Sequence, residues 1–201
     1  MPTSLIVVDD FLDNAHTLRE AALQLTYPQQ RGPYPGRNSH ERINLQGLDS
    51  AVSRLVGEPL RALCEGQAHG KFRIALASDV GKSKVHVDPS HWSGILYLSR
   101  DDDCRGGTDF FRHKATRTER APFDDGEARA HGYGSAKQMV DEILERDGLD
   151  DSAWESTMQV PMRFNRLVLL RPWLWHTAGE NFGTCPENAR LVYLMFFANA
   201  G

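Results

Sequence analysis

The feature that most constrains the fold is a series of short, strand-like segments that begins just after Lys71. Each segment is rich in apolar, β-branched or aromatic residues and is bounded by Gly, Pro, Asp or Asn, which is typical of β-strands. The predicted strands cover residues 72–78, 83–88, 93–99, 107–112, 157–163, 166–171, 174–178 and 190–198. This series favours a jelly-roll, or cupin-like, barrel.

Two helices are predicted before these strands. Apolar residues recur at helical spacing over 13–25 and again over 48–64, where Pro59 is expected to break the second helix. The stretch 27–39 holds several Gly and Pro residues and is predicted to be a long loop, whereas the run 5–8 suits a strand. The predicted class is therefore α+β: a double-stranded β-helix (jelly-roll, cupin-like) with N-terminal helices.

A charged segment interrupts the predicted strands at about 113–156. Within it, residues 136–146 form a clear helical pattern that ends before Gly148. One interpretation is a solvated surface insertion, and the other is a lid over the mouth of the barrel. The length of 201 residues suits one domain, so the prediction is a single domain over 1–201 that includes this charged helical insertion.

Composition excludes several classes of protein. No apolar run approaches the roughly 20 residues that span a bilayer, and the N-terminal run 5–8 lacks the features of a signal peptide. A formal net charge of −4 without a basic stripe disfavours nucleic acid as a partner. Three cysteines without metal-finger spacing indicate reduced thiols and a cytoplasmic location. The sequence does not indicate an oligomeric state.

The most informative stretch is Val85-His86-Val87-Asp88-Pro89. Successive side chains of an extended strand point to opposite faces, so His86 and Asp88 share one face and the two valines pack on the other. His-x-Asp is a compact chelate for a metal ion. Alone it is a weak signal, and the alternative is a surface His beside an Asp.

Two further residues give this triplet a chemical context. His176 ends an apolar, tryptophan-rich segment, and two His with one Asp on strands of a small barrel form the 2-His-1-carboxylate set that binds non-haem iron. The same set also suits zinc. Arg190 opens an apolar strand, where it lies either at the solvent edge or buried beside an anion.

Other polar and aromatic residues are weaker candidates. His91 and His113 are possible neighbours of the site, and Asp109 fits a metal less well than Asp88. The remaining histidines, His16, His40, His69 and His131, are expected in solvent. Candidates for a substrate pocket are Tyr34, Arg37 and Trp92.

Five motifs occur in an order that resembles the Fe(II)- and 2-oxoglutarate-dependent dioxygenases, in particular the prolyl-hydroxylase-like branch and the short bacterial members of the superfamily. They are His86-x-Asp88, Gly94–Ser99, Arg105–Phe111, Leu167–His176 and Arg190, within a resemblance that covers about 83–198. The resemblance implies that His86, Asp88 and His176 bind Fe(II). It also implies that Arg190 pairs with the distal carboxylate of 2-oxoglutarate and that Tyr97 assists it.

The implied activity is hydroxylation of an unactivated C–H bond in a small molecule or an amino-acid side chain, with dioxygen and 2-oxoglutarate as co-substrates. One alternative is a cupin-like module that binds a metal or a small acid without oxygenase turnover, and another is a zinc hydrolase. The chain departs from the pattern in its insertion, and no residue clearly matches the one that bonds the 1-carboxylate of 2-oxoglutarate.

Overall fold

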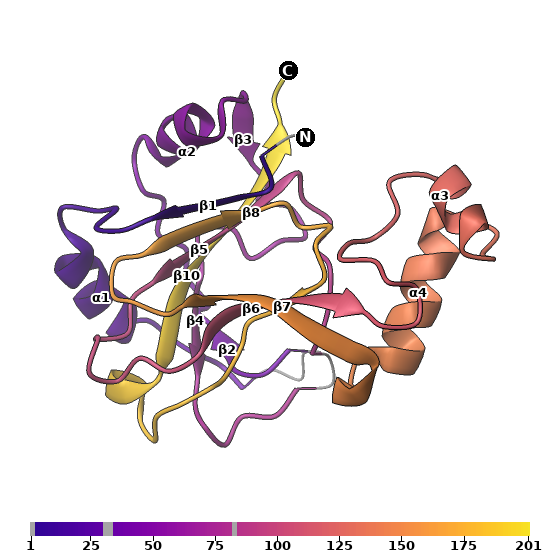
Figure 1. The fold of residues 1–201 in the computed structure, drawn as a ribbon. Coiled ribbons are helices and arrows are strands. Elements are labelled where there is room, and N and C mark those ends of the chain that lie inside the picture. Colours follow the sequence, from indigo (N-terminus) through magenta and orange to yellow (C-terminus); the bar gives the residue numbers. More distant parts are fainter. Residues whose placement is uncertain (1–2, 30–33, 82–83) are drawn as a thin grey trace.

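Two antiparallel sheets form the centre of the computed structural model, which describes residues 3–29, 34–81 and 84–201 (Figure 1). The larger sheet contains β1 (Leu5–Val8), β2 (Arg37–Asn38), β3 (Leu60–Ala62), β4 (Phe72–Ala75), β5 (Trp92–Tyr97), β8 (Leu167–Leu170) and β10 (Arg190–Asn199). The smaller sheet contains β6 (Gly107–His113), β7 (Trp154–Pro161) and β9 (His176–Thr177). The helices are α1 (Ala15–Leu23), α2 (Leu48–Val56), α3 (Asp125–Ala130) and α4 (Ala136–Asp147), with short 3-10 turns at Asp151–Ala153 and Pro186–Asn188.

The strand order of the larger sheet is β1-β8-β5-β10-β4-β2, with β3 also paired to β10, and that of the smaller sheet is β7-β6-β9. Neighbouring strands far apart in the chain pair antiparallel, as β10 does with both β4 and β5. This arrangement confirms the α+β, jelly-roll-like class.

Alternation along β10 separates two cores. Leu191, Tyr193 and Met195 pack on the outer face of the larger sheet with apolar residues of α1 and α2. Val192 faces inward, where it packs with side chains of the smaller sheet such as Phe110. Burial of each large apolar side chain stabilises the fold by about 1.5–3 kcal/mol. Because both faces of β10 are buried, its sequence is almost continuously apolar.

Two local predictions need correction. The second helix ends at Val56 because Gly57 adopts a left-handed conformation with φ of 72°, and residues 60–62 then pair with β10 instead of continuing the helix. The predicted loop 27–39 contains the short strand β2, while residues 30–33 of that loop lie outside the described residues.

The predicted strand 83–88 is also wrong in detail. Residue 83 lies outside the described residues, and the rest is extended chain with a single bridge between His86 and His176. Val85 and Val87 nevertheless pack away from the triplet's polar side chains, as the alternation predicts.

The charged insertion has a small core of its own. Met139 and Ile143 of α4 pack with Ala128 of α3, and this cluster continues onto Trp154 and Trp175 of the smaller sheet region. Helices α3 and α4 lie together at one side of the molecule (Figure 1). None of the helices in the described ranges is long and apolar enough to cross a bilayer.

Candidate metal centre and its cavity

His86, Asp88 and His176 meet at one point between the two sheets. One potential ligand atom from each lies within 4.8 Å of the others. Oδ1 of Asp88 lies 3.7 Å from Nε2 of His86, and Oδ2 lies 3.5 Å from Nε2 of His176. Two backbone hydrogen bonds between His86 and His176, of 2.9 and 3.2 Å, hold the distant segments together.

Backbone carbonyls orient both imidazoles. Nδ1 of His86 donates to the carbonyl of Lys84 at 2.9 Å, and Nδ1 of His176 donates to that of Leu174 at 2.7 Å. Because a carbonyl only accepts, the proton of each neutral ring is on Nδ1 and the lone pair is on Nε2. Both lone pairs therefore face Asp88, as metal ligation requires.

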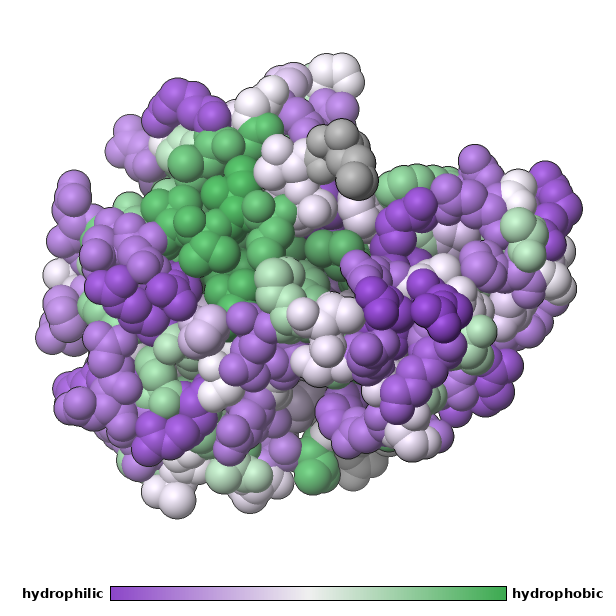
Figure 2. All heavy atoms as spheres, in the orientation of Figure 1, coloured by the Kyte–Doolittle hydropathy of each residue, from purple (hydrophilic) through white to green (hydrophobic). Residues whose placement is uncertain are grey.

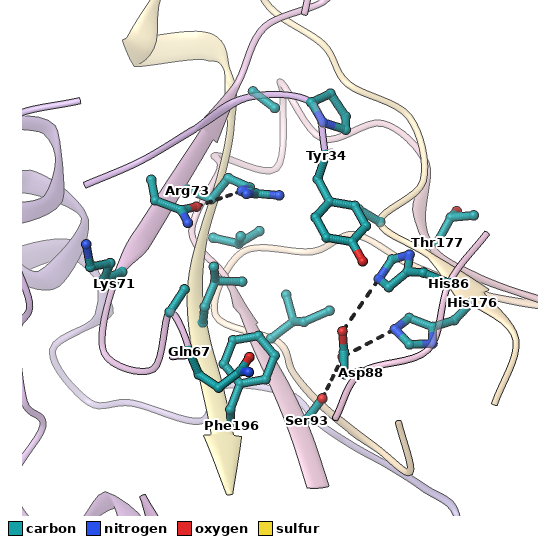
Figure 3. A pocket seen from close by; sticks show the side chains of 18 of the residues that line it. Tyr34, Gln67, Lys71, Arg73, His86, Asp88, Ser93, His176, Thr177 and Phe196 are labelled. Carbon is teal, nitrogen blue, oxygen red and sulfur yellow. Dashed lines mark hydrogen bonds and ion pairs between the residues drawn. The ribbon is translucent and has the colours of Figure 1, made fainter. Parts of the chain in front are cut away.

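The electrostatics of the triad also favour the ligand forms. Burial and then the neighbouring His176 lower the pKa of His86 to about 4, so this imidazole is neutral near pH 7. Burial opposes ionisation of Asp88, but the positive charge that His176 and His86 carry when protonated and the hydrogen bond from Ser93 outweigh burial and lower its pKa. Ser93 donates to Oδ2 of Asp88 at 2.7 Å, which fixes the carboxylate (Figure 3).

This donor set fits a divalent metal ion. Ligand bonds of about 2.1 Å place adjacent ligand atoms roughly 3 Å apart, close to the spacing of the two histidine–carboxylate pairs. Two imidazoles and one carboxylate suit Fe(II) and leave coordination positions open. The same donors suit zinc, so the triad alone does not select the metal.

A cavity of about 500 Å³ opens beside the triad. Its wall combines segments 34–38 and 66–68 with residues of β4, β5 and β10, and no residue of the insertion 113–156 contributes to it. The insertion packs instead against Trp175, whose side chain belongs to the insertion's core. In this arrangement the insertion does not cover the cavity, and the lid interpretation stays a prediction.

Arg190 lies in the wall of this cavity at the start of β10. Only 1% of the residue is exposed, and its Nε and Nη2 have no hydrogen-bond partner among the described residues. Burial lowers its pKa, which expresses the cost of a desolvated guanidinium without an anion. The cavity thus presents a cation that requires a negatively charged ligand.

Tyr97 lies next to Arg190 but does not line the cavity. Its hydroxyl is hydrogen-bonded to that of Thr108 at 2.7 Å, and its ring centre lies 5.9 Å from Cζ of Arg190. The contact of Tyr97 with a ligand carboxylate stays a prediction, since its hydroxyl would have to turn away from Thr108.

The three candidates for a substrate pocket have different positions. Tyr34 lines the cavity, with its ring centre 4.6 Å from that of His86. Trp92 is fully buried in the outer core, under the guanidinium of Arg171 at 4.2 Å. Arg37 does not line the cavity either, whereas its neighbour Asn38 does.

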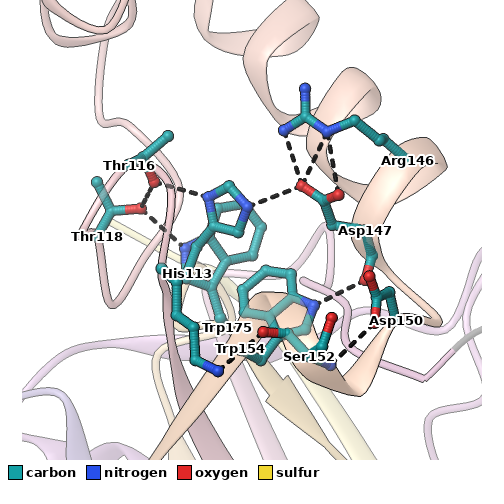
Figure 4. A network of polar contacts seen from close by, with 10 residues as sticks. His113, Thr116, Thr118, Arg146, Asp147, Asp150, Ser152, Trp154 and Trp175 are labelled. Atoms are coloured by element: carbon teal, nitrogen blue, oxygen red, sulfur yellow. Dashed lines mark hydrogen bonds and ion pairs between the residues drawn. The ribbon is translucent and has the colours of Figure 1, made fainter.

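The remaining polar candidates lie in other networks. His113 is buried in the base of the insertion, where it contacts Thr116 and Asp147 at 2.8 Å each (Figure 4). His91 contacts Glu58 at 2.6 Å. His69, expected in solvent, is 4% exposed and hydrogen-bonded to the backbone of Phe196. Asp109 accepts from Gln159 at 2.6 Å.

The polar residues of the cavity that sequence reasoning missed include Lys71, Arg73 and Ser93. A signal was present, because Lys71 and Arg73 alternate with Phe72 and Ile74 and so mark a polar face on a strand. That this polar face points into the barrel was not visible in the sequence.

Comparison with known proteins gives one family match. The profile of a family of unknown function, DUF6445, matches residues 2–197. No curated protein matches the sequence.

Solved structures show similarity in fold. The non-heme alpha-ketoglutarate-dependent carbocyclase SnoK from nogalamycin biosynthesis has a TM-score of 0.56 and 13% identity, over 100% of this chain and 87% of SnoK. A prolyl hydroxylase from Trichoplax adhaerens, in complex with a peptide fragment of hypoxia-inducible factor, has a TM-score of 0.52 and 11% identity, over 98% and 84% of the two chains. HygX from Streptomyces hygroscopicus, with nickel, 2-oxoglutarate and hygromycin B bound, has a TM-score of 0.50 and 16% identity, over 98% and 83%. These likenesses confirm that the chain has the fold of the 2-oxoglutarate-dependent oxygenases.

Proposed function

This chain belongs to the DUF6445 family, whose function is unknown, and we propose that it is an Fe(II)- and 2-oxoglutarate-dependent oxygenase. The observation that carries the proposal is the pairing of two features in one cavity. A triad with both imidazole lone pairs aimed at a carboxylate lies beside a buried arginine that has no anionic partner among the residues described. A zinc hydrolase would use the triad but would have no need of that arginine.

In this proposal His86, Asp88 and His176 hold the metal. The carbonyls of Lys84 and Leu174 fix the two imidazoles, and Ser93 fixes the carboxylate, so that little reorganisation is needed on binding. Bound there, Fe(II) would supply the activation of dioxygen that C–H oxidation requires.

Arg190 anchors the distal carboxylate of 2-oxoglutarate. A planar guanidinium pairs with a carboxylate through two parallel hydrogen bonds, and the two free donors of Arg190 suit such a pair. Tyr97 is within reach of the same group if its hydroxyl exchanges Thr108 for the carboxylate. The remainder of the cavity then receives the substrate.

The reaction proposed is hydroxylation of an unactivated C–H bond of a small molecule or an amino-acid side chain. A cavity of about 500 Å³ suits such a group. The proposal treats residues 1–201 as one oxygenase-like domain. It also keeps the cytoplasm as the compartment, supported by three unpaired cysteines, Cys64, Cys104 and Cys185.

Calorimetry and product analysis test this function directly. 2-Oxoglutarate is titrated into Ni(II)-loaded protein, and succinate is then measured in air with Fe(II), 2-oxoglutarate and ascorbate. We expect one 2-oxoglutarate site per chain and slow succinate release without substrate, both lost in His176→Ala. Metal-loaded protein that does not bind 2-oxoglutarate would rule out the proposal and favour a metal-binding module or a zinc hydrolase.

A further inference from the structure

The cavity holds more positive charge than 2-oxoglutarate can neutralise. Five of the described residues that line it are Lys or Arg, and Asp88, a member of the triad, is the one carboxylate among those described. The five cations are Arg42, Lys71, Arg73, Lys84 and Arg190.

Two of the five are already used in the structure. Arg42 donates to the carbonyls of His69 and Gln67, and so braces the loop that ends at β4. Lys84 forms an ion pair with Asp151 of the insertion. With Arg190 assigned to 2-oxoglutarate, Lys71 and Arg73 remain, and neither has an ion-pair partner within the part of the chain that the structure describes.

The strand register gives the positions of these cations relative to Arg190. On β10 and β4, Arg190 lies opposite Ala75 and Val192 lies opposite Arg73. Arg73 is therefore a diagonal neighbour of Arg190 on the inward face, at a typical backbone separation of about 7–8 Å. Lys71 precedes Arg73 by two residues, so it lies on the same face and further from Arg190.

The guanidinium of Arg73 is held in place with donors to spare. Its Nε donates to Oδ1 of Asn38 at 2.7 Å, and its Cζ lies 5.8 Å from the ring centre of Tyr34. Figure 3 shows Arg73 between Lys71 and the triad, beside Tyr34. Burial and then the charge of Arg190 lower the pKa of Arg73 to about 10, so it stays cationic at neutral pH.

The two arginines on one face of the cavity repel each other, and neither has an anionic partner within the described ranges. One 2-oxoglutarate presents one distal carboxylate, which can form a bidentate pair with only one of them. We propose that Arg73, assisted by Lys71, forms a second anion subsite, and that the substrate of this site carries a carboxylate. This inference rests on the proposed function, which assigns Arg190 to 2-oxoglutarate.

The test compares acids with their uncharged amides. Full-length protein loaded with Zn(II) and 2-oxoglutarate, which does not turn over, is titrated with 3-phenylpropionate and 3-phenylpropionamide, and with hexanoate and hexanamide. Binding is followed by ligand-observed NMR. We expect each acid to bind about tenfold or more tightly than its amide, as a charge-assisted pair predicts.

Three variants locate that preference. Arg73→Gln should remove it, and Arg73→Lys should retain part of it, because a point charge replaces the planar fork. Lys137→Gln is the control, since Lys137 is an exposed lysine of α4 that does not line the cavity, and it should leave the preference intact. Thermal melting of each variant checks that the fold is retained.

Two results would overturn the inference. One is equal binding of acid and amide, or no binding of either acid, by the wild-type protein. The other is an Arg73→Gln variant that keeps the acid preference; if it also loses affinity for 2-oxoglutarate, Arg73 is assigned to the co-substrate. A wild-type protein that does not bind 2-oxoglutarate would rule out the proposed function but not the second anion subsite. In that case the acid–amide comparison is made on Zn(II)-loaded protein alone.

Discussion

At the scale of single residues, the two triad histidines share one local arrangement. Each Nδ1 donates to the carbonyl two residues earlier in the chain, at Lys84 for His86 and at Leu174 for His176. The backbone therefore selects the tautomer that leaves Nε2 free. Preorganisation of this kind reduces the cost of binding a metal, because neither ring has to reorient.

Replacing His176 with Ala should weaken metal binding roughly 100-fold or more, because one of three protein ligands is removed. Anaerobic titration of Fe(II), or titration of Ni(II) in air, measures the change. His131→Ala, an exposed histidine of the insertion, is the control and should bind metal as the wild type does. Unchanged affinity in His176→Ala would contradict the assignment of the triad.

Replacing Arg190 with Gln should weaken 2-oxoglutarate binding by about 30- to 1000-fold, which corresponds to on the order of 2–4 kcal/mol for a desolvated bidentate pair. Arg190→Lys should recover only part of the affinity. Calorimetry on Ni(II)-loaded protein measures both variants, and Arg105→Gln, at an exposed arginine, serves as control. If the affinity of Arg190→Gln equals that of the wild type, the anchor lies elsewhere.

At the scale of elements, the insertion is stabilised from within. Figure 4 shows His113 of β6 joined to Asp147 at the end of α4, which in turn accepts from Arg146. Nε2 of His113 donates to Asp147 at 2.8 Å, and Nη2 of Arg146 donates to it at 2.7 Å. This network links α4 to the smaller sheet, and Trp154 of the adjoining apolar cluster donates to the carbonyl of Asp147 at 2.8 Å.

Asp147→Asn should lower the free energy of unfolding by about 1–3 kcal/mol, because the buried Nε2 of His113 loses a charged acceptor. The hydrogen bond from Arg146 lowers the pKa of Asp147. The native state therefore binds fewer protons than the unfolded state just below the usual aspartate pKa, and stability is lost as pH falls through that window. Urea unfolding between pH 3 and pH 7 should show this loss in wild type and less of it in the variant. Asp141→Asn, an exposed position of α4, should keep the wild-type profile.

At the scale of the whole molecule, the triad joins segments that belong to different sheets. His176 is in β9 of the smaller sheet, whereas Asp88 contacts Ser93 of β5 in the larger sheet. A bound metal ion would therefore link the two layers. Figure 2 shows polar side chains over much of this face and one large apolar area in its upper left part.

Metal binding should accordingly raise the melting temperature. At a free metal concentration of about 100 Kd, linkage predicts roughly 2.7 kcal/mol of stabilisation, which is on the order of 5–10 °C for a chain of this size. Differential scanning fluorimetry with Ni(II) and with a chelator measures the shift. The His176→Ala variant should show almost none, and an equal shift in that variant would mean that the metal binds elsewhere.

Much of the candidate site was predictable from the sequence because its signals are local. A His-x-Asp triplet places two ligands on one face of any extended segment. This holds for residues 84–88 although they do not form a regular strand. Likewise, an arginine at the start of an apolar strand indicated either burial or a solvent edge. The signal for the helix over 136–146 was also local, since Ser135 caps this helix and its side chain accepts from the backbone of Gln138.

The sequence by itself determined the β-rich class, the order of the strands along the chain and the residue types of the triad, because each depends on short-range periodicity and spacing. The tertiary structure alone decided which face of each strand is inside. The pairing of β4 with β10 directs Arg73 into the cavity with Arg190. Trp92 was a candidate for the substrate pocket and directly precedes the predicted strand 93–99, but it faces the outer core. Which face of a strand points inward depends on its long-range register, and a pattern of alternation does not say which of the two faces will be buried.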